Sequence, residues 1–134
     1  MCNLSKILFL FIAISFFSTS YAADHNHDWV KVGEGTTGIG TVQSFVDMND
    51  IHRMNSEIIS FRFVSNVPSA NASHVITLLM NCNTNHYNII DDRVYAGLYG
   101  NGEASESVSH SKDFILVKGT QLESVARLVC AKKI

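Results

Sequence analysis

Two cysteines of this chain, Cys82 and Cys130, are candidates for a disulfide bond. The third, Cys2, lies inside an N-terminal segment that reads as an export signal, and it would leave with that segment. An even number of cysteines in a short exported domain predicts a disulfide, because exported proteins fold in an oxidising compartment. We therefore expect one covalent link, between Cys82 and Cys130, in the mature protein.

The export signal is expected to cover residues 1–22. Lys6 supplies a positive charge, and residues 7–17 form an apolar run. Ser20 and Ala22 are the small residues that precede a cleavage point. The apolar run is shorter than the ~20 residues that a membrane-spanning helix needs. We expect cleavage after Ala22, with neither a lipid anchor nor a membrane span in the mature form. The protein would then be exported and lie in the periplasm, at the cell surface or outside the cell.

Cleavage after Ala22 would place a histidine third in the mature chain. The Ala23 amine, two backbone amides and the His25 imidazole can form a square-planar nitrogen site, which suits Cu(II) or Ni(II). His27 could add an axial contact. The alternative is a polar N-terminus whose histidines are incidental. Apart from this metal site, we expect no cofactor.

A glycine pattern, Gly33-x-Gly35-x-x-Gly38, has the spacing of a dinucleotide-binding loop. That chemistry needs a helix N-terminus directly after the loop to receive the pyrophosphate. Residues 39–46 are instead rich in strand-forming residues, and Glu34 would repel phosphate. We interpret the pattern as a glycine turn.

The remaining titratable residues do not form a catalytic or zinc-binding pattern. The histidines outside the N-terminus are dispersed, without ligand spacing: His52, His74, His86 and His110. Asp91 and Asp92 are adjacent, and adjacent strand residues point to opposite faces, so we do not expect them to share a proton. We expect these two residues to form a turn. No Gly-x-Ser-x-Gly nucleophile motif occurs. We expect no enzyme activity.

The charge of the chain argues against nucleic acid as a partner. The formal net charge is −2, and loss of Lys6 with the signal makes it more negative. The charges are scattered, whereas binding to a phosphate backbone needs a basic face.

Three tyrosines are the candidate binding residues. We expect Tyr95 and Tyr99 on one strand face with Gly97 between them, and Tyr87 on the preceding strand beside them. Such an aromatic stripe can be an interface hot spot, and it can equally be cross-strand packing. If it is exposed, it is the expected surface for a protein partner or a homodimer.

The elements that would position these residues are strands followed by one helix. Residues 58–64 give the clearest alternation, with Ile59, Phe61 and Phe63 on one face. Residues 75–82 are apolar on both faces, as in a central strand. Further strands are expected at residues 29–32, 41–47, 87–90, 94–99 and 114–117. Residues 66–73 and 100–111 are expected to be loops.

The C-terminal helix is expected to begin at Thr120, which forms a capping box with Glu123. Its apolar positions recur at helical spacing, with Cys130 at the edge of the same stripe: Leu122, Val125, Ala126 and Val129. We expect an α+β fold, with an antiparallel sheet of about six strands and this helix packed on one face, tied by the disulfide. Residues 23–134 would form a single domain.

Several stretches resemble the bacterial surface-adhesin protein E family. They follow Trp29 in the family's order: residues 45–51, 78–95, 99–102 and 122–130. The resemblance implies an antiparallel sheet with a disulfide-linked C-terminal helix and a non-enzymatic, adhesin-like role at the cell envelope. In some members the partners are host matrix and serum proteins.

This chain departs from the family in lacking a lipoprotein cysteine. The alternative function is therefore a soluble periplasmic protein with a structural, stress or metal-buffering role.

Overall fold

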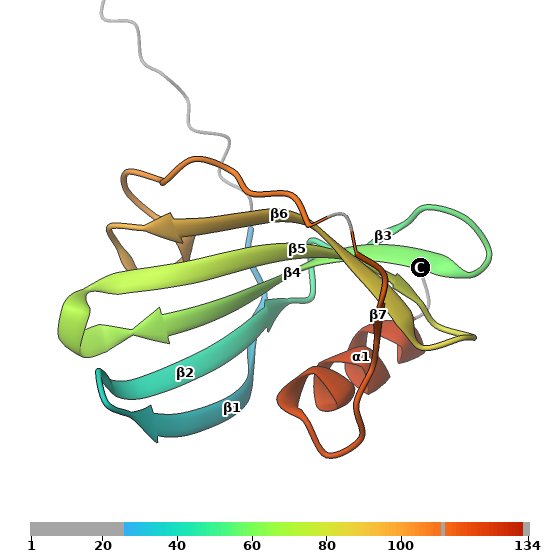
Figure 1. The fold of residues 1–134 in the computed structure, drawn as a ribbon, viewed down its shortest axis with the longest axis horizontal. Helices are drawn as coiled ribbons and strands as arrows, with labels where there is room; N and C mark the ends of the chain where they lie inside the picture. The colour runs from blue at the N-terminus through green and yellow to red at the C-terminus, as the bar shows by residue number, and fades with distance from the viewer. Residues whose placement is uncertain (1–25, 111, 133–134) are drawn as a thin grey trace, which may run out of the picture.

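The computed structural model describes residues 26–110 and 112–132. These residues form an antiparallel sheet with one α-helix on one face (Figure 1). The strand order is β1-β2-β4-β5-β6-β7, and a short β3 pairs with β4. The strands are β1 (Trp29–Thr37), β2 (Gly40–Asp47), β3 (His52–Arg53), β4 (Ile58–Val67), β5 (Ala72–Asn81), β6 (His86–Tyr95) and β7 (Phe114–Ile115). The helix is α1 (Gln121–Ala131), and the two 3₁₀ turns are η1 (Pro68–Ala70) and η2 (Leu98–Gly100). The expected α+β fold is confirmed.

The main core lies between α1 and the centre of the sheet. Ile59 and Phe61 of β4 are fully buried, as are Leu78 and Met80 of β5. β4 and β5 pair along their whole lengths, from Ile58↔Asn81 to Val67↔Ala72. The alternation seen in the sequence therefore sets which face of β4 meets the helix.

The helix begins where its cap predicts. The Thr120 hydroxyl accepts a hydrogen bond from the Glu123 N–H at 3.4 Å. The Glu123 carboxylate does not return to Thr120; it accepts from Arg127 at 2.9 Å, one turn later. Val125 and Val129 are buried against the sheet. Within the described residues, no helix is both long and apolar enough to span a membrane.

The predicted disulfide is present. Cys82 directly follows β5, Cys130 lies in the last turn of α1, and their Cα atoms are 5.8 Å apart. The bond closes a separation of 48 residues. Closing a loop of that length stabilises the fold by about 4 kcal/mol in the chain-entropy description.

A second, smaller apolar cluster lies on the face opposite α1. Phe45, Val64 and Val75 are buried there and occupy neighbouring positions across β2, β4 and β5. The η2 turn packs on this cluster: a Cβ added to Gly100 would lie 3.1 Å from Val75 Cγ2, and the Tyr99 ring lies beside Phe45. The chain therefore covers both faces of the central strands.

Three segments differ from the sequence-based expectations. The glycine segment is not a separate turn, because β1 continues through it and pairs with β2 as far as Thr37↔Gly40. The loop expected at residues 66–73 shrinks to the η1 turn. The two strands expected at residues 87–90 and 94–99 are one strand, β6, which contains Asp91 and Asp92 and ends at Tyr95.

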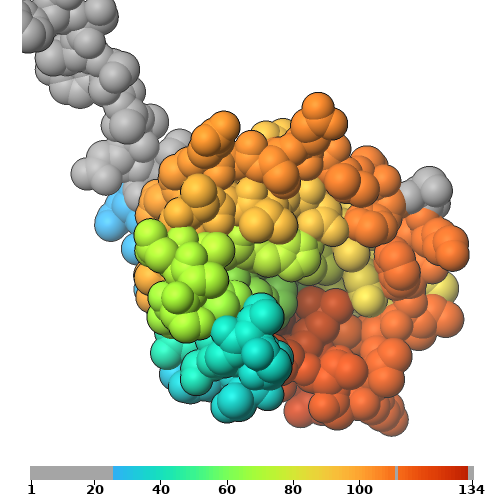
Figure 2. All heavy atoms as spheres, turned by 60° about the vertical axis from the view of Figure 1, so that its left-hand side comes forward, coloured from blue at the N-terminus to red at the C-terminus, as the bar shows by residue number. Residues whose placement is uncertain are grey.

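The polar segment before β7 lies along the edge of β6. Figure 2 shows this segment, in orange, running over the yellow β6 residues. Backbone hydrogen bonds join them, including Ser105 N–H to Val94 O and His110 N–H to Ile89 O. These bonds occupy N–H and C=O groups that an edge strand would otherwise leave open.

Candidate functional site

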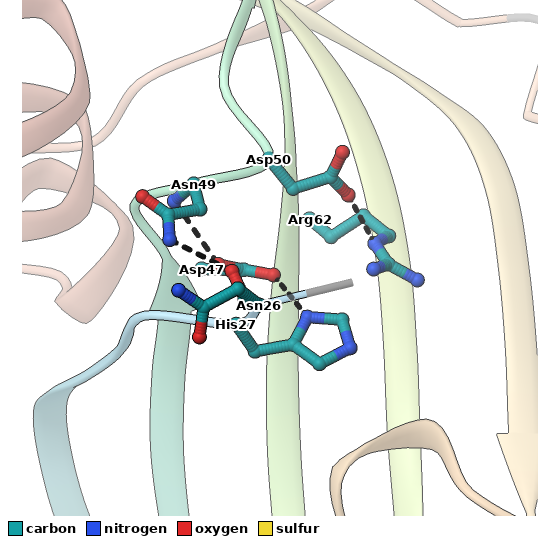
Figure 3. A pocket seen from close by; sticks show the side chains of 6 residues that line it. All are labelled: Asn26, His27, Asp47, Asn49, Asp50 and Arg62. Carbon is teal, nitrogen blue, oxygen red and sulfur yellow. Dashed lines mark hydrogen bonds and ion pairs between the residues drawn. The ribbon is translucent and has the colours of Figure 1, made fainter. Parts of the chain in front are cut away.

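A pocket of about 370 Å³ opens where β2 ends and the chain turns back (Figure 3). Asp47 and Arg62 alternate along their strands with the core residues Val46 and Phe61, so they point to the face opposite α1. The lining residues are Asn26, His27, Asp47, Asn49, Asp50 and Arg62. Six polar side chains from three separate segments thus meet at one hollow, whose volume is in the ordinary range for small-molecule sites.

Asp47 is the buried anchor of the pocket, with 1% of its surface exposed. One carboxylate oxygen accepts the N–H groups of Asp28 and Asn49, both at 3.0 Å, and the other lies 2.5 Å from Nδ1 of His27. Burial alone would raise the pKa of Asp47, but these hydrogen bonds outweigh it and the pKa is lowered. Asp47 is therefore an ionised carboxylate that fixes the chain on both sides of it.

Asp50 and Arg62 form the outer wall. The Nε–H of Arg62 donates to Asp50 Oδ2 at 2.5 Å, and His52 Nε2 lies 2.8 Å from the other oxygen. The terminal Nη groups of Arg62 have no hydrogen-bond partner among the described residues. The ion pair holds the guanidinium in place and leaves the Nη donors available to a ligand.

A row of aromatic rings starts at the pocket. The His27 imidazole stacks on Trp29, with ring centroids 5.2 Å apart. Trp29 contacts Tyr99 at 5.5 Å, and Tyr99 contacts the buried Phe45 at 5.1 Å. Both separations are typical of favourable aromatic pairs. The row thus connects the pocket wall to the small cluster on this face.

Tyr99 occupies a backbone conformation that tyrosine rarely adopts, with φ of 56°. Two polar side chains, each 1% exposed, hold the turn: Asn66 Oδ1 accepts the Tyr99 N–H at 2.8 Å, and Ser73 Oγ accepts the Gly100 N–H at 2.9 Å. The Ser73 hydroxyl also donates to Gly97 O at 2.6 Å. A strained residue persists only where its surroundings over-determine it, and such residues gather at functional sites.

Comparison with known proteins places the fold. The family model described as surface-adhesin protein E matches residues 29–131. The chain belongs to the surface-adhesin protein E family. The fold is similar to that of Haemophilus influenzae protein E, with 23% identity and a TM-score of 0.56, over 66% of this chain and 76% of that one. A second crystal form of the same protein gives the same identity and score over 80% of its chain. No curated protein sequence matches this chain closely.

In this adhesin-family chain the three candidate tyrosines do not form one stripe. Tyr87 lies near the start of β6 and stacks on Phe114 at 5.3 Å, whereas Tyr95 is the last residue of β6. Tyr99 is not on a strand at all but in the η2 turn. The expected shared face of Tyr95 and Tyr99 is wrong, because the chain leaves the sheet between them. A binding role for each tyrosine stays a prediction.

The histidines of the described region are paired with aspartates rather than with one another. His74 and His110 each contact Asp92, at 2.5 and 3.0 Å, and His86 contacts Asp113 at 2.6 Å. Among the described residues, no three His, Cys, Asp or Glu side chains are grouped to hold a metal ion.

The predicted copper or nickel site lies outside the described residues, because Ala23 and His25 belong to the part of the chain that is not described. It stays a prediction. His27, which was expected to add an axial ligand, contacts Asp47 through Nδ1.

Only a weak signal for the pocket is visible in the sequence. The residues 45–51 carry the resemblance to the adhesin family and include Asp47, Asn49 and Asp50 as a turn after a strand. Arg62 interrupts the most regular apolar alternation. Nothing in the sequence joined them to His27, because that contact spans 20 residues and depends on the β1–β2 pairing.

The side chains of the pocket offer groups that can bind a ligand. A His–Asp pair such as His27–Asp47 can move a proton, and among the described lining residues no hydroxyl, thiol or amine side chain lies beside it. The pocket does offer amide, carboxylate and guanidinium groups next to aromatic rings. Such a set fixes a ligand by hydrogen bonds and ring contact.

Proposed function

We propose that this protein is an exported, non-enzymatic protein-binding module of the cell envelope with an adhesin-like role. The observation that carries the proposal is the family match, which spans residues 29–131 and so includes nearly all of the described fold. The partner we propose is a host matrix or serum protein. The export signal predicted at residues 1–22 and the Cys82–Cys130 disulfide support this placement, since disulfides persist in oxidising compartments.

The contact surface we propose is the edge formed by β6 and the segment that covers it. Large apolar side chains are exposed along it: Ile90, Val94, Val108, Ile115 and Val117. Val108 is joined to β6 through its N–H to Asp92 O, and Ile115 pairs with His86. Exposed apolar residues that lie together along one edge of a small domain mark an interaction surface more often than scattered ones do.

A localisation experiment tests the envelope role first. Protease shaving of intact cells, with a tag after Ile134, should remove the tag if the protein is at the surface. Protection until lysis would contradict the adhesin role. It would favour the alternative, a soluble periplasmic protein with a structural, stress or metal-buffering function.

A binding experiment tests the contact surface. The double variant Val108→Glu/Ile115→Glu should lose binding to immobilised laminin, vitronectin and fibronectin, the probes for matrix and serum partners. Ile39→Glu is the matched control, because Ile39 is 66% exposed and Ile115 64%, but Ile39 lies between β1 and β2. Equal binding by both variants would overturn this surface. A homodimer through the same edge would appear in the wild type as a concentration-dependent mass that the double variant lacks.

A further inference from the structure

We propose that the pocket lined by Asn49, Asp50 and Arg62, with the His27 ring at its wall and Trp29 stacked on that ring, binds a neutral sugar residue of a glycan. This goes beyond the protein-binding role and does not depend on it. Three independent features of the described residues support it: open polar groups, ring faces beside them and the charge of the lining.

The open polar groups suit hydroxyls. Asn49 donates its amide N–H to Asn26 O at 2.7 Å, and its own carbonyl oxygen has no partner among the described residues. The Asn26 carboxamide and the Arg62 Nη groups are likewise without a hydrogen-bond partner there. In Figure 3 these side chains surround the hollow. Sugars carry several adjacent hydroxyls that both donate and accept, so they can satisfy amide, carboxylate and guanidinium groups together.

The ring row suits the other side of a sugar. A pyranose ring has a face of C–H groups, which packs on the electron-rich face of an aromatic ring. The His27 ring lines the pocket, Trp29 stacks on it, and Tyr99 extends the row. Tyr99 is held in its strained conformation by buried Asn66 and Ser73, a fixed arrangement that binding sites use to limit the loss of freedom on binding.

The charge of the lining favours a neutral sugar over an acidic one. The carboxylates of Asp47 and Asp50 outnumber the single guanidinium of Arg62. The positive charge of Arg62 is already paired with the Asp50 carboxylate, through the 2.5 Å contact. Less of that charge is therefore left to attract an anionic ligand. A uronic acid would place a third carboxylate beside these two, and like charges at short distance repel.

Trp29 makes the proposal directly measurable, because it is the only tryptophan of the chain. The intrinsic fluorescence of the full protein should change in a saturable way with at least one of three neutral probes: lactose, maltose and N,N′-diacetylchitobiose. The expected dissociation constant is about 1 mM, as suits a small ligand held by a few hydrogen bonds. Glucuronic acid should give no saturable change.

Matched arginine variants locate the site. Arg62→Gln should weaken binding by about tenfold or more, since it removes charged donors. Arg93→Gln is the control: Arg93 also sits on a strand, pairs with an aspartate through Nε and is 39% exposed, against 36% for Arg62, but it lies outside the pocket. Tyr99→Asn removes the ring while keeping a residue that tolerates positive φ, and it should also weaken binding.

The outcomes separate clearly. Saturable binding that Arg62→Gln and Tyr99→Asn weaken, and Arg93→Gln leaves unchanged, supports the proposal. No saturable change with any neutral probe overturns it, as does equal weakening by the two arginine variants. Binding of glucuronic acid alone also overturns it. Thermal unfolding of each variant checks that the fold is intact. Loss of matrix-protein binding without loss of sugar binding would contradict the adhesin-like role and support the sugar site.

Discussion

The Nδ1 atom of His27 lies 2.5 Å from Oδ2 of Asp47, so the segment entering β1 is fastened to the end of β2. The same carboxylate accepts the N–H groups of Asp28 and Asn49. One buried side chain therefore fixes the entry to β1, the turn after β2 and the wall of the pocket. Because the His27 ring stacks on Trp29, the contact with Asp47 also helps to position the first rings of the row.

Asp47→Asn should destabilise the protein by about 1–3 kcal/mol. The carboxylate accepts hydrogen bonds from its surroundings, and the NH₂ group of an asparagine would place donors against those donors. Urea unfolding followed by circular dichroism measures the change. Asp113→Asn is the control, since Asp113 pairs with a histidine on the exposed surface and should change stability by less than about 0.5 kcal/mol. Equal effects of the two substitutions would show that the Asp47 contacts do not fix this corner.

Stability should fall on acidification through the aspartates whose pKa is lowered, among them Asp92 and Asp47. Burial raises the pKa of Asp92, but hydrogen bonds from His110 and His74 outweigh it and the pKa is lowered, as it is for Asp47. A lowered pKa in the folded state means that the contribution is complete above the ordinary aspartate value of 3.8 and is lost as the pH falls through and below it.

The measurement is the free energy of unfolding between pH 7 and pH 3, in wild type and in Asp92→Asn. The variant should lose less stability than wild type over the acidic part of this range, because one of the aspartates with a lowered pKa is gone. Parallel curves would mean that Asp92 does not contribute in this way.

Removing the disulfide should destabilise the protein by about 4 kcal/mol, the value expected for a closed loop of this length. The double variant Cys82→Ser/Cys130→Ser avoids a leftover thiol, and urea unfolding measures the loss. Adding a reductant should lower the stability of wild type toward that of the variant and leave the variant unchanged. A reductant effect on the variant would point to a cause other than this bond.

Local sequence determined much of the fold. The alternation of Ile59 and Phe61, the Thr120 cap and the apolar stripe of α1 each act within a few residues, so they are visible without the structure. The pairing of Cys82 with Cys130 was predicted from their number and from the expected export of the chain, and the structure contains it. These are the features in which local pattern and tertiary packing agree.

The segments predicted wrongly are those that tertiary contacts decide. Gly33 lies within β1 rather than in a turn, and a Cβ there would lie 2.2 Å from the Gln121 side chain of α1. A larger residue at this position would have to displace the end of the Gln121 side chain, a contact that no local pattern reveals. Tyr99 leaves the sheet because Asn66 and Ser73, far away in sequence, hold its turn.

The predicted N-terminal metal site remains open to a direct test. Mass spectrometry of the mature protein should find Ala23 as the first residue, and titration with Cu(II) should then give the visible absorption band of a square-planar nitrogen site. His25→Ala is the control and should lose the band, because the imidazole completes the ligand set. The His27 imidazole contacts Asp47, so His27→Ala should keep the copper absorption band. The same substitution should remove the contact that His27 makes with Asp47 at the pocket wall. A mature chain that begins at Asp24, or an unchanged band in His25→Ala, would contradict the site.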